Sequence, residues 1–114
     1  MHNTHPSRRH LFLYLEIIDR DTQTLLGHLG DLSKEGVLII TDKPLKMNGI
    51  YNIRIQLPED EDISKPYIDV KVEVRWEKPD INPALQLVGC HFIEIDPEDL
   101  YVIDDVSEVL GFNE

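Results

Sequence analysis

The sequence has one cysteine, no long apolar run and no Lys or Arg from Pro79 to its end at Glu114. Cys90 alone can form neither an internal disulfide nor an all-cysteine metal site. No run approaches the roughly 18 apolar residues that span a bilayer. The N-terminus is polar and lacks the apolar core of a signal peptide. These absences exclude a disulfide framework and predict a cytoplasmic protein without membrane insertion.

Basic charge is scarce overall: 22 acidic residues against 11 basic ones give a net charge of −11. Such a balance disfavours nucleic-acid polymers and anionic membranes as partners, because both are bound mainly through Lys and Arg. Residues 1–10 differ, since they hold Arg8 and Arg9 and no acid. We therefore expect a flexible basic arm at residues 1–10 ahead of an acidic body.

A chain of 114 residues fits one domain. Short apolar runs and strict apolar–polar alternation, separated by polar turns, predict six strands and no crossover helices. In the last strand the apolar phase changes around Gly89, which predicts a bulge or sharp bend there. The predicted strands are 11–18, 24–32, 37–40, 51–57, 68–77 and 84–95, the first of them buried on much of both faces.

The last segment changes to helical spacing, with Leu100, Ile103 and Val106 on one side. Asp96 suits the N-cap, and Gly111 suits the helix end. Six strands followed by one helix predict an all-β fold with a C-terminal helix, built as an antiparallel barrel or sandwich. We expect the arm at 1–10, the strands within 11–95, and the helix and tail at 96–114 as part of the same domain.

No enzyme constellation is present in the sequence. Ser33 lacks the G-x-S-x-G surroundings of an activated nucleophile. The five histidines lack metal-ligand spacing, and the acidic run 59–62 lacks the glycine of a calcium loop. Trp76 and Cys90 fall on apolar strand positions and are expected in the core. We predict a protein that is not an enzyme and has no metal and no cofactor.

One polar combination remains. A hairpin of the first two strands brings Arg8 and Arg9 near the turn that contains Asp31, Ser33 and Gly36. Guanidinium groups can clamp phosphate and stack on a base, while Asp accepts from a guanine N–H edge and Ser offers a hydroxyl. This arrangement suits a phosphorylated, planar ligand. The alternative is a solvated arm beside an ordinary turn, in which Gly36 supplies a positive φ.

At these residues the sequence resembles the PilZ domain, a bacterial receptor module for cyclic di-GMP. The family carries [DN]-x-S-x-x-G between the second and third strands, and residues 31–36 match it at every specified position. Residues 74–76 and 89–92 resemble the family's late strands. The resemblance implies a six-stranded antiparallel PilZ-like β-barrel. It also implies a cyclic di-GMP site at Arg8, Arg9, Asp31, Ser33 and Gly36.

The family's R-x-x-x-R motif is incomplete, because the second arginine position holds Leu13 counted from Arg9, or Phe12 counted from Arg8. Two hypotheses follow. In the first, the protein binds cyclic di-GMP and relays this second-messenger signal to an unidentified protein effector. In the second, it is a degenerate PilZ domain that does not bind the nucleotide and acts as a protein–protein adaptor. An exposed edge strand or the helix could also support a homodimer.

Overall fold

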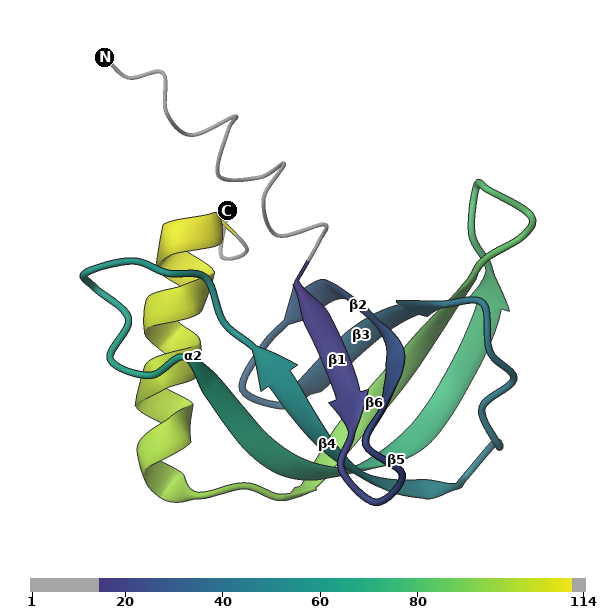
Figure 1. Ribbon diagram of the computed structural model, residues 1–114, viewed down its shortest axis with the longest axis horizontal. Helices are drawn as coiled ribbons and strands as arrows, with labels where there is room; N and C mark the ends of the chain where they lie inside the picture. The colour runs from purple at the N-terminus through teal and green to yellow at the C-terminus, as the bar shows by residue number, and fades with distance from the viewer. Residues whose placement is uncertain (1–14, 112–114) are drawn as a thin grey trace.

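The computed structural model describes residues 15–111 of the chain. Six antiparallel strands close into one barrel in the order β1-β2-β3-β6-β5-β4, with β4 pairing back onto β1 (Figure 1). Because the sheet closes on itself, the protein is a barrel and not a sandwich, the two architectures that the sequence predicted. Closure also leaves none of the six described strands with a free edge, so the expected edge-strand route to a dimer is wrong. The strands are β1 (Glu16–Asp19), β2 (Thr24–Leu32), β3 (Gly36–Thr41), β4 (Ile50–Gln56), β5 (Tyr67–Pro79) and β6 (Gln86–Glu94).

The strand positions agree with the predicted ranges, and the first strand differs in burial. Residues 11–14 of its predicted range lie outside the described part of the chain. In the rest, Ile17 is fully buried while Glu16 is exposed. The prediction that this strand is covered on both faces is wrong here, because a small barrel has its core only on the inside.

The core fills the barrel and continues under a helix. Inward positions alternate along each strand with outward ones, as in β5, where Ile68, Val70, Val72 and Val74 are buried. Helix α2 (Pro97–Leu110) adds its own apolar face to the same cluster. It lies against the barrel end from which the β2–β3 turn and the β4–β5 loop emerge (Figure 1). The helix thus covers one opening of the barrel.

The ends of α2 are those that the sequence predicts. The Asp96 side chain accepts a hydrogen bond from the Glu98 backbone N–H at 3.1 Å. Gly111 ends the helix with φ 79°, and its N–H donates to the Ser107 carbonyl. Buried Val102, Ile103, Val106 and Leu110 form the inner face.

The predicted irregularity near Gly89 is present, but the extra residue lies on the neighbouring strand. Val74 pairs with Cys90 and Trp76 pairs with Gly89, so Arg75 of β5 has no partner in β6. A second irregularity leaves Ile93 of β6 unpaired between Phe92 and Glu94. The change of apolar phase in the last strand thus reflects two β-bulges in the β5–β6 pair, with opposite strands carrying the extra residue.

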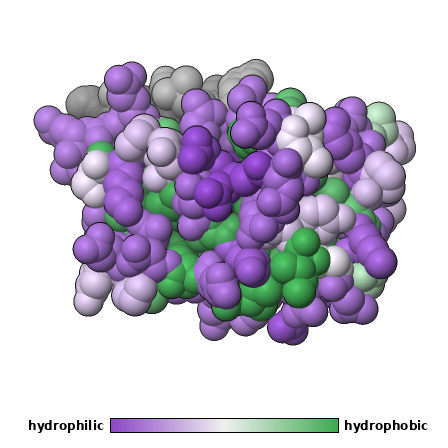
Figure 2. All heavy atoms as spheres, turned by 60° about the horizontal axis from the view of Figure 1, so that its bottom comes forward, coloured by the Kyte–Doolittle hydropathy of each residue, from purple (hydrophilic) through white to green (hydrophobic). Residues whose placement is uncertain are grey.

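Polar residues cover most of the face shown in Figure 2, and apolar side chains gather in the lower half of that view. Within residues 15–111, no helix has the length and apolar character needed to cross a membrane.

Candidate functional site

The turn between β2 and β3 carries the D-x-S-x-x-G residues. Gly30 has no partner in β3, and this bulge lets Leu29 and Leu32 both face the core while Asp31 faces outward. Asp31 Oδ1 accepts from the Leu32 N–H at 2.8 Å. Ser33 Oγ accepts from the Glu35 N–H at 3.2 Å. The turn therefore fixes two polar side chains on the barrel surface.

Gly36 follows this turn as the first residue of β3, and its backbone lies close to β6. A Cβ at this position would meet the Cys90 carbonyl oxygen at 2.0 Å, closer than real Cβ contacts allow. Among the described glycines only Gly111 has a positive φ. The expectation that Gly36 supplies a positive φ is therefore wrong. The glycine is needed because β3 and β6 pair here with no room for a side chain.

Trp76 lies on the outer surface, where it faces the turn. The sequence places it in the core, yet 43% of it is exposed. The bulge at Arg75 is the reason, because one extra residue turns Trp76 from the inward to the outward side of β5. Its indole lies directly on Gly89, where an added Cβ would be 2.1 Å from Cε2. Gly89 thus provides the flat backbone on which the ring rests.

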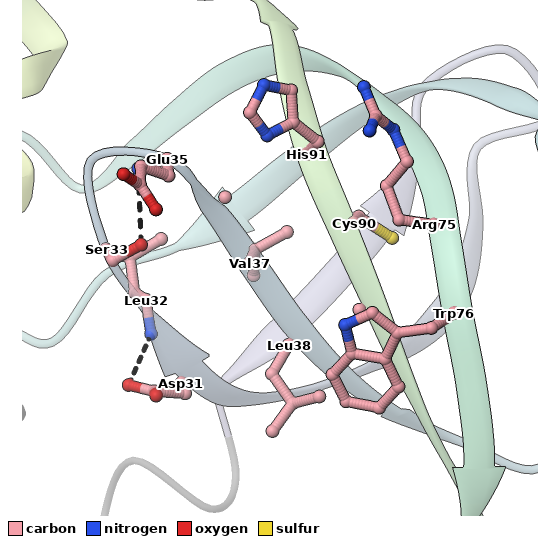
Figure 3. A pocket seen from close by; sticks show the side chains of 12 residues that line it. Asp31, Leu32, Ser33, Glu35, Val37, Leu38, Arg75, Trp76, Cys90 and His91 are labelled. Atoms are coloured by element: carbon pink, nitrogen blue, oxygen red, sulfur yellow. Dashed lines mark hydrogen bonds between the residues drawn. The ribbon is translucent and has the colours of Figure 1, made fainter.

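The turn and the bulged part of β5 face each other across a hollow of about 250 Å³. Figure 3 shows Asp31, Ser33 and Glu35 on one side, with Arg75, Trp76 and His91 on β5 and β6 across from them. The volume is below the range of about 300–1,000 Å³ that is typical of pockets enclosing a drug-sized ligand. The hollow suits part of a larger ligand, such as one base with its phosphate. Its lining residues are Asp31, Leu32, Ser33, Glu35, Gly36, Val37, Leu38, Arg75, Trp76, Gly89, Cys90 and His91.

The hollow contains charge of both signs and one thiol. Asp31 and Glu35 supply carboxylates, and Arg75 supplies a guanidinium that is 3.0 Å from Glu73 Oε1. Cys90 is 6% exposed, and burial raises the pKa of its thiol to about 12. A thiol that stays protonated is a poor nucleophile and a poor metal ligand, so Cys90 acts here as a packing residue.

Three of the five predicted site residues come together in this hollow: Asp31, Ser33 and Gly36. Arg8 and Arg9 lie outside the described residues. The sequence prediction missed Trp76, Arg75 and His91 as lining residues. The signal that could have found them is the phase change near Gly89, since a bulge there reverses which side chains of the paired strands face outward.

Metal and nucleophile chemistry find no support in this part of the molecule. Within residues 15–111, no three His, Cys, Asp or Glu side chains are grouped as ligands for a metal ion. Ser33 Oγ accepts a hydrogen bond from a backbone N–H, and its hydroxyl contacts no base. The arrangement supplies hydrogen-bond acceptors, an aromatic face and a cation, which are elements of ligand binding.

The fold and the hollow together define a small closed β-barrel module with a C-terminal helix. The family model of the PilZ domain matches residues 7–107, and the chain belongs to this family. The PilZ family is a family of regulatory modules associated with cyclic di-GMP signalling.

One solved structure similar to this chain is that of the Bacillus subtilis inhibitor of motility (MotI/DgrA), with a TM-score of 0.64 and 15% identity. The match covers 85% of this chain and 44% of that protein, so this chain spans less than half of its length. At this identity the likeness concerns the fold. No curated protein matches the chain by sequence.

Proposed function

We propose that this protein is a cyclic di-GMP receptor that relays the second-messenger signal to a protein partner. The observation that carries the proposal is that the D-x-S-x-x-G residues and Trp76 line one hollow on the barrel surface. Nothing in the formation of a β-turn requires a half-exposed indole across from it. Membership of the PilZ family supports the choice of ligand. The bacterial and cytoplasmic setting is part of the same proposal.

Each lining group has a role suited to one half of the nucleotide. The Asp31 carboxylate uses Oδ1 within the turn and leaves Oδ2 without a partner among the described residues, so it can accept from a guanine N–H edge. The Ser33 hydroxyl can donate to a phosphate oxygen. The Trp76 ring offers a face for stacking, which contributes about 1–3 kcal/mol per base in nucleic-acid-binding proteins. Arg8 and Arg9 would approach from the arm and clamp the phosphates.

The contacts of the turn suggest how binding would reach a partner. Ser107 Oγ of α2 donates to the Leu32 carbonyl at 3.3 Å, and Lys34 Nζ lies 3.0 Å from Asp104 Oδ2. A ligand that shifts the turn would therefore change the contacts of α2 directly. In the proposed mechanism, the nucleotide orders the arm on the barrel, and arm and helix together expose or hide the partner surface.

A second function is favoured by one observation in the sequence, namely Leu13 in place of the second arginine of R-x-x-x-R. A charge-assisted hydrogen bond contributes about 1.5–3 kcal/mol, so losing it would weaken binding roughly tenfold to 150-fold. In this reading the protein is a PilZ adaptor that docks its partner without the nucleotide.

Isothermal titration calorimetry with cyclic di-GMP distinguishes the two functions. The receptor predicts a saturable heat that Asp31→Ala, Ser33→Ala and Arg9→Ala each weaken. Thermal unfolding of the same variants is the control, because the first two side chains also hold the turn. Absence of heat at high micromolar nucleotide would overturn the receptor and leave the adaptor. A partner complex that still forms with Arg9→Ala and that the nucleotide does not change would support the adaptor.

A further inference from the structure

The hollow contains a single strong cation in the described part of the chain. Arg75 is its only Lys or Arg lining residue, and it faces a lining that includes Asp31 and Glu35. A dianionic ligand entering an acidic protein needs short-range positive charge, because long-range attraction is absent at a net charge of −11. Arg75 is therefore in the position where such charge is most needed.

The β5 bulge is the reason that Arg75 and Trp76 both face the hollow. Without the extra residue, alternation along β5 would place Trp76 inside the barrel after the buried Val74. With it, the cation and the aromatic ring are consecutive outward residues, and in Figure 3 Arg75 and His91 point the same way. Bulges commonly serve to redirect a side chain in this manner beside binding sites.

The guanidinium of Arg75 is only loosely held. Its Nε contacts Glu73 Oε1 at 3.0 Å, the side chain is 52% exposed, and its terminal nitrogens have no partner among the described residues. Arg54 is the contrast on β4: it gives both Nε and Nη2 to Asp69 and lies 3.9 Å from the centre of the Tyr67 ring. Exposed ion pairs with a single contact contribute little to stability. Arg75 can therefore exchange Glu73 for a phosphate at little cost in free energy.

We propose that Arg75 is the second cation of the nucleotide site. From β5 it supplies the phosphate contact that the incomplete R-x-x-x-R motif lacks, and Glu73 holds the guanidinium while the site is empty. A planar guanidinium can bind two phosphate oxygens at once, which an ammonium group cannot do with the same geometry. This inference rests on the proposed receptor function and adds a specificity-determining residue to it.

The test is calorimetric titration of cyclic di-GMP into matched variants of the full chain. Arg75→Ala should raise the Kd about tenfold to 150-fold, and Arg75→Lys should recover only part of this loss. Glu73→Gln should lower the Kd, because it frees Arg75 and removes a negative charge. The control is the Lys71–Glu94 ion pair, which joins β5 to β6 at 3.6 Å and lies outside the hollow. Lys71→Ala and Glu94→Gln change the net charge equally and should alter the Kd by less than about threefold.

Failure of the inference can be told apart from failure of the receptor function. Wild-type binding with an unchanged Kd in Arg75→Ala would overturn the role of Arg75 and leave the receptor standing. Equal losses in Arg75→Ala and Lys71→Ala would also overturn it, since net charge alone would then explain both. Absence of binding by the wild type would overturn both proposals. Thermal unfolding checks that each substitution leaves the barrel folded.

Discussion

The contact between Gly89 and Trp76 gives the sharpest prediction about the shape of the hollow. In Gly89→Ala the new Cβ would start 2.1 Å from Trp76 Cε2, whereas real Cβ contacts essentially never fall below 3.0 Å. The indole must therefore move outward, because the Gly89 backbone is held in the β3–β6 and β5–β6 pairings. The substitution should open the hollow on its β5 side without breaking the barrel.

The loss of unfolding free energy in Gly89→Ala depends on how much of the Trp76 ring is buried. A tryptophan side chain removes about 150–250 Å² of surface from water when it is wholly buried, and Trp76 is 43% exposed. Complete loss of the remaining cover would expose about 100 Å² and cost about 2.5 kcal/mol at ~25 cal/mol per Å². Because a displaced ring keeps some apolar neighbours, we expect Gly89→Ala to lower the free energy of unfolding by about 1–2 kcal/mol.

Two measurements check this prediction. Trp76 is the only tryptophan, so its emission should shift to the red in Gly89→Ala, and urea unfolding gives the stability loss. A double-mutant cycle with Trp76→Ala isolates the contact: Gly89→Ala should cost much less when the indole is absent. An unchanged emission maximum would refute the proposed contact between Gly89 and the Trp76 ring. So would an equal loss of unfolding free energy with and without the indole.

Three further predictions concern the support of the site. Gly36→Ala should cost about 3 kcal/mol in urea unfolding, because its Cβ would start 2.0 Å from the Cys90 carbonyl oxygen; a loss below about 1 kcal/mol would contradict the close approach. Ser107→Ala should cost about 1 kcal/mol, because the buried Leu32 carbonyl loses its donor; an unchanged urea midpoint would speak against this link between turn and helix. Burial raises the pKa of Cys90 from 9.0 to about 12, so its contribution to stability is full below pH 9 and declines as the pH rises toward 12. Urea unfolding from pH 8 to 11 should show a steeper decline for the wild type than for Cys90→Ala, and parallel curves would count against the raised pKa.

The predictable part of this structure depends on local patterns. Alternation along residues 68–74 predicts β5, because side-chain direction in a strand repeats every two residues. Asp96 and Gly111 predict the ends of α2, because a cap acts on the backbone within a few residues of itself.

The features that the sequence prediction missed depend on contacts with a partner strand. A bulge exists only relative to the neighbouring strand, so alternation alone continues through Arg75 and assigns Trp76 to the core. The reason for Gly36 likewise lies in the Cys90 carbonyl on β6, far away in the sequence. The hollow was therefore predictable on its β2–β3 side, where a motif marks it. On its β5–β6 side the sequence shows only a phase change near Gly89, which does not say that the extra residue is Arg75 of β5.

The central claim is that cyclic di-GMP binds in the hollow between the Asp31–Gly36 turn and Trp76. Titration of the nucleotide while Trp76 emission is recorded tests this claim most directly, since the chain has no other tryptophan. We predict a saturable change in emission because a guanine stacks on the indole, and we predict that Ser33→Ala shifts the curve to higher nucleotide concentration. Saturable calorimetric binding with no change in Trp76 emission would contradict the claim.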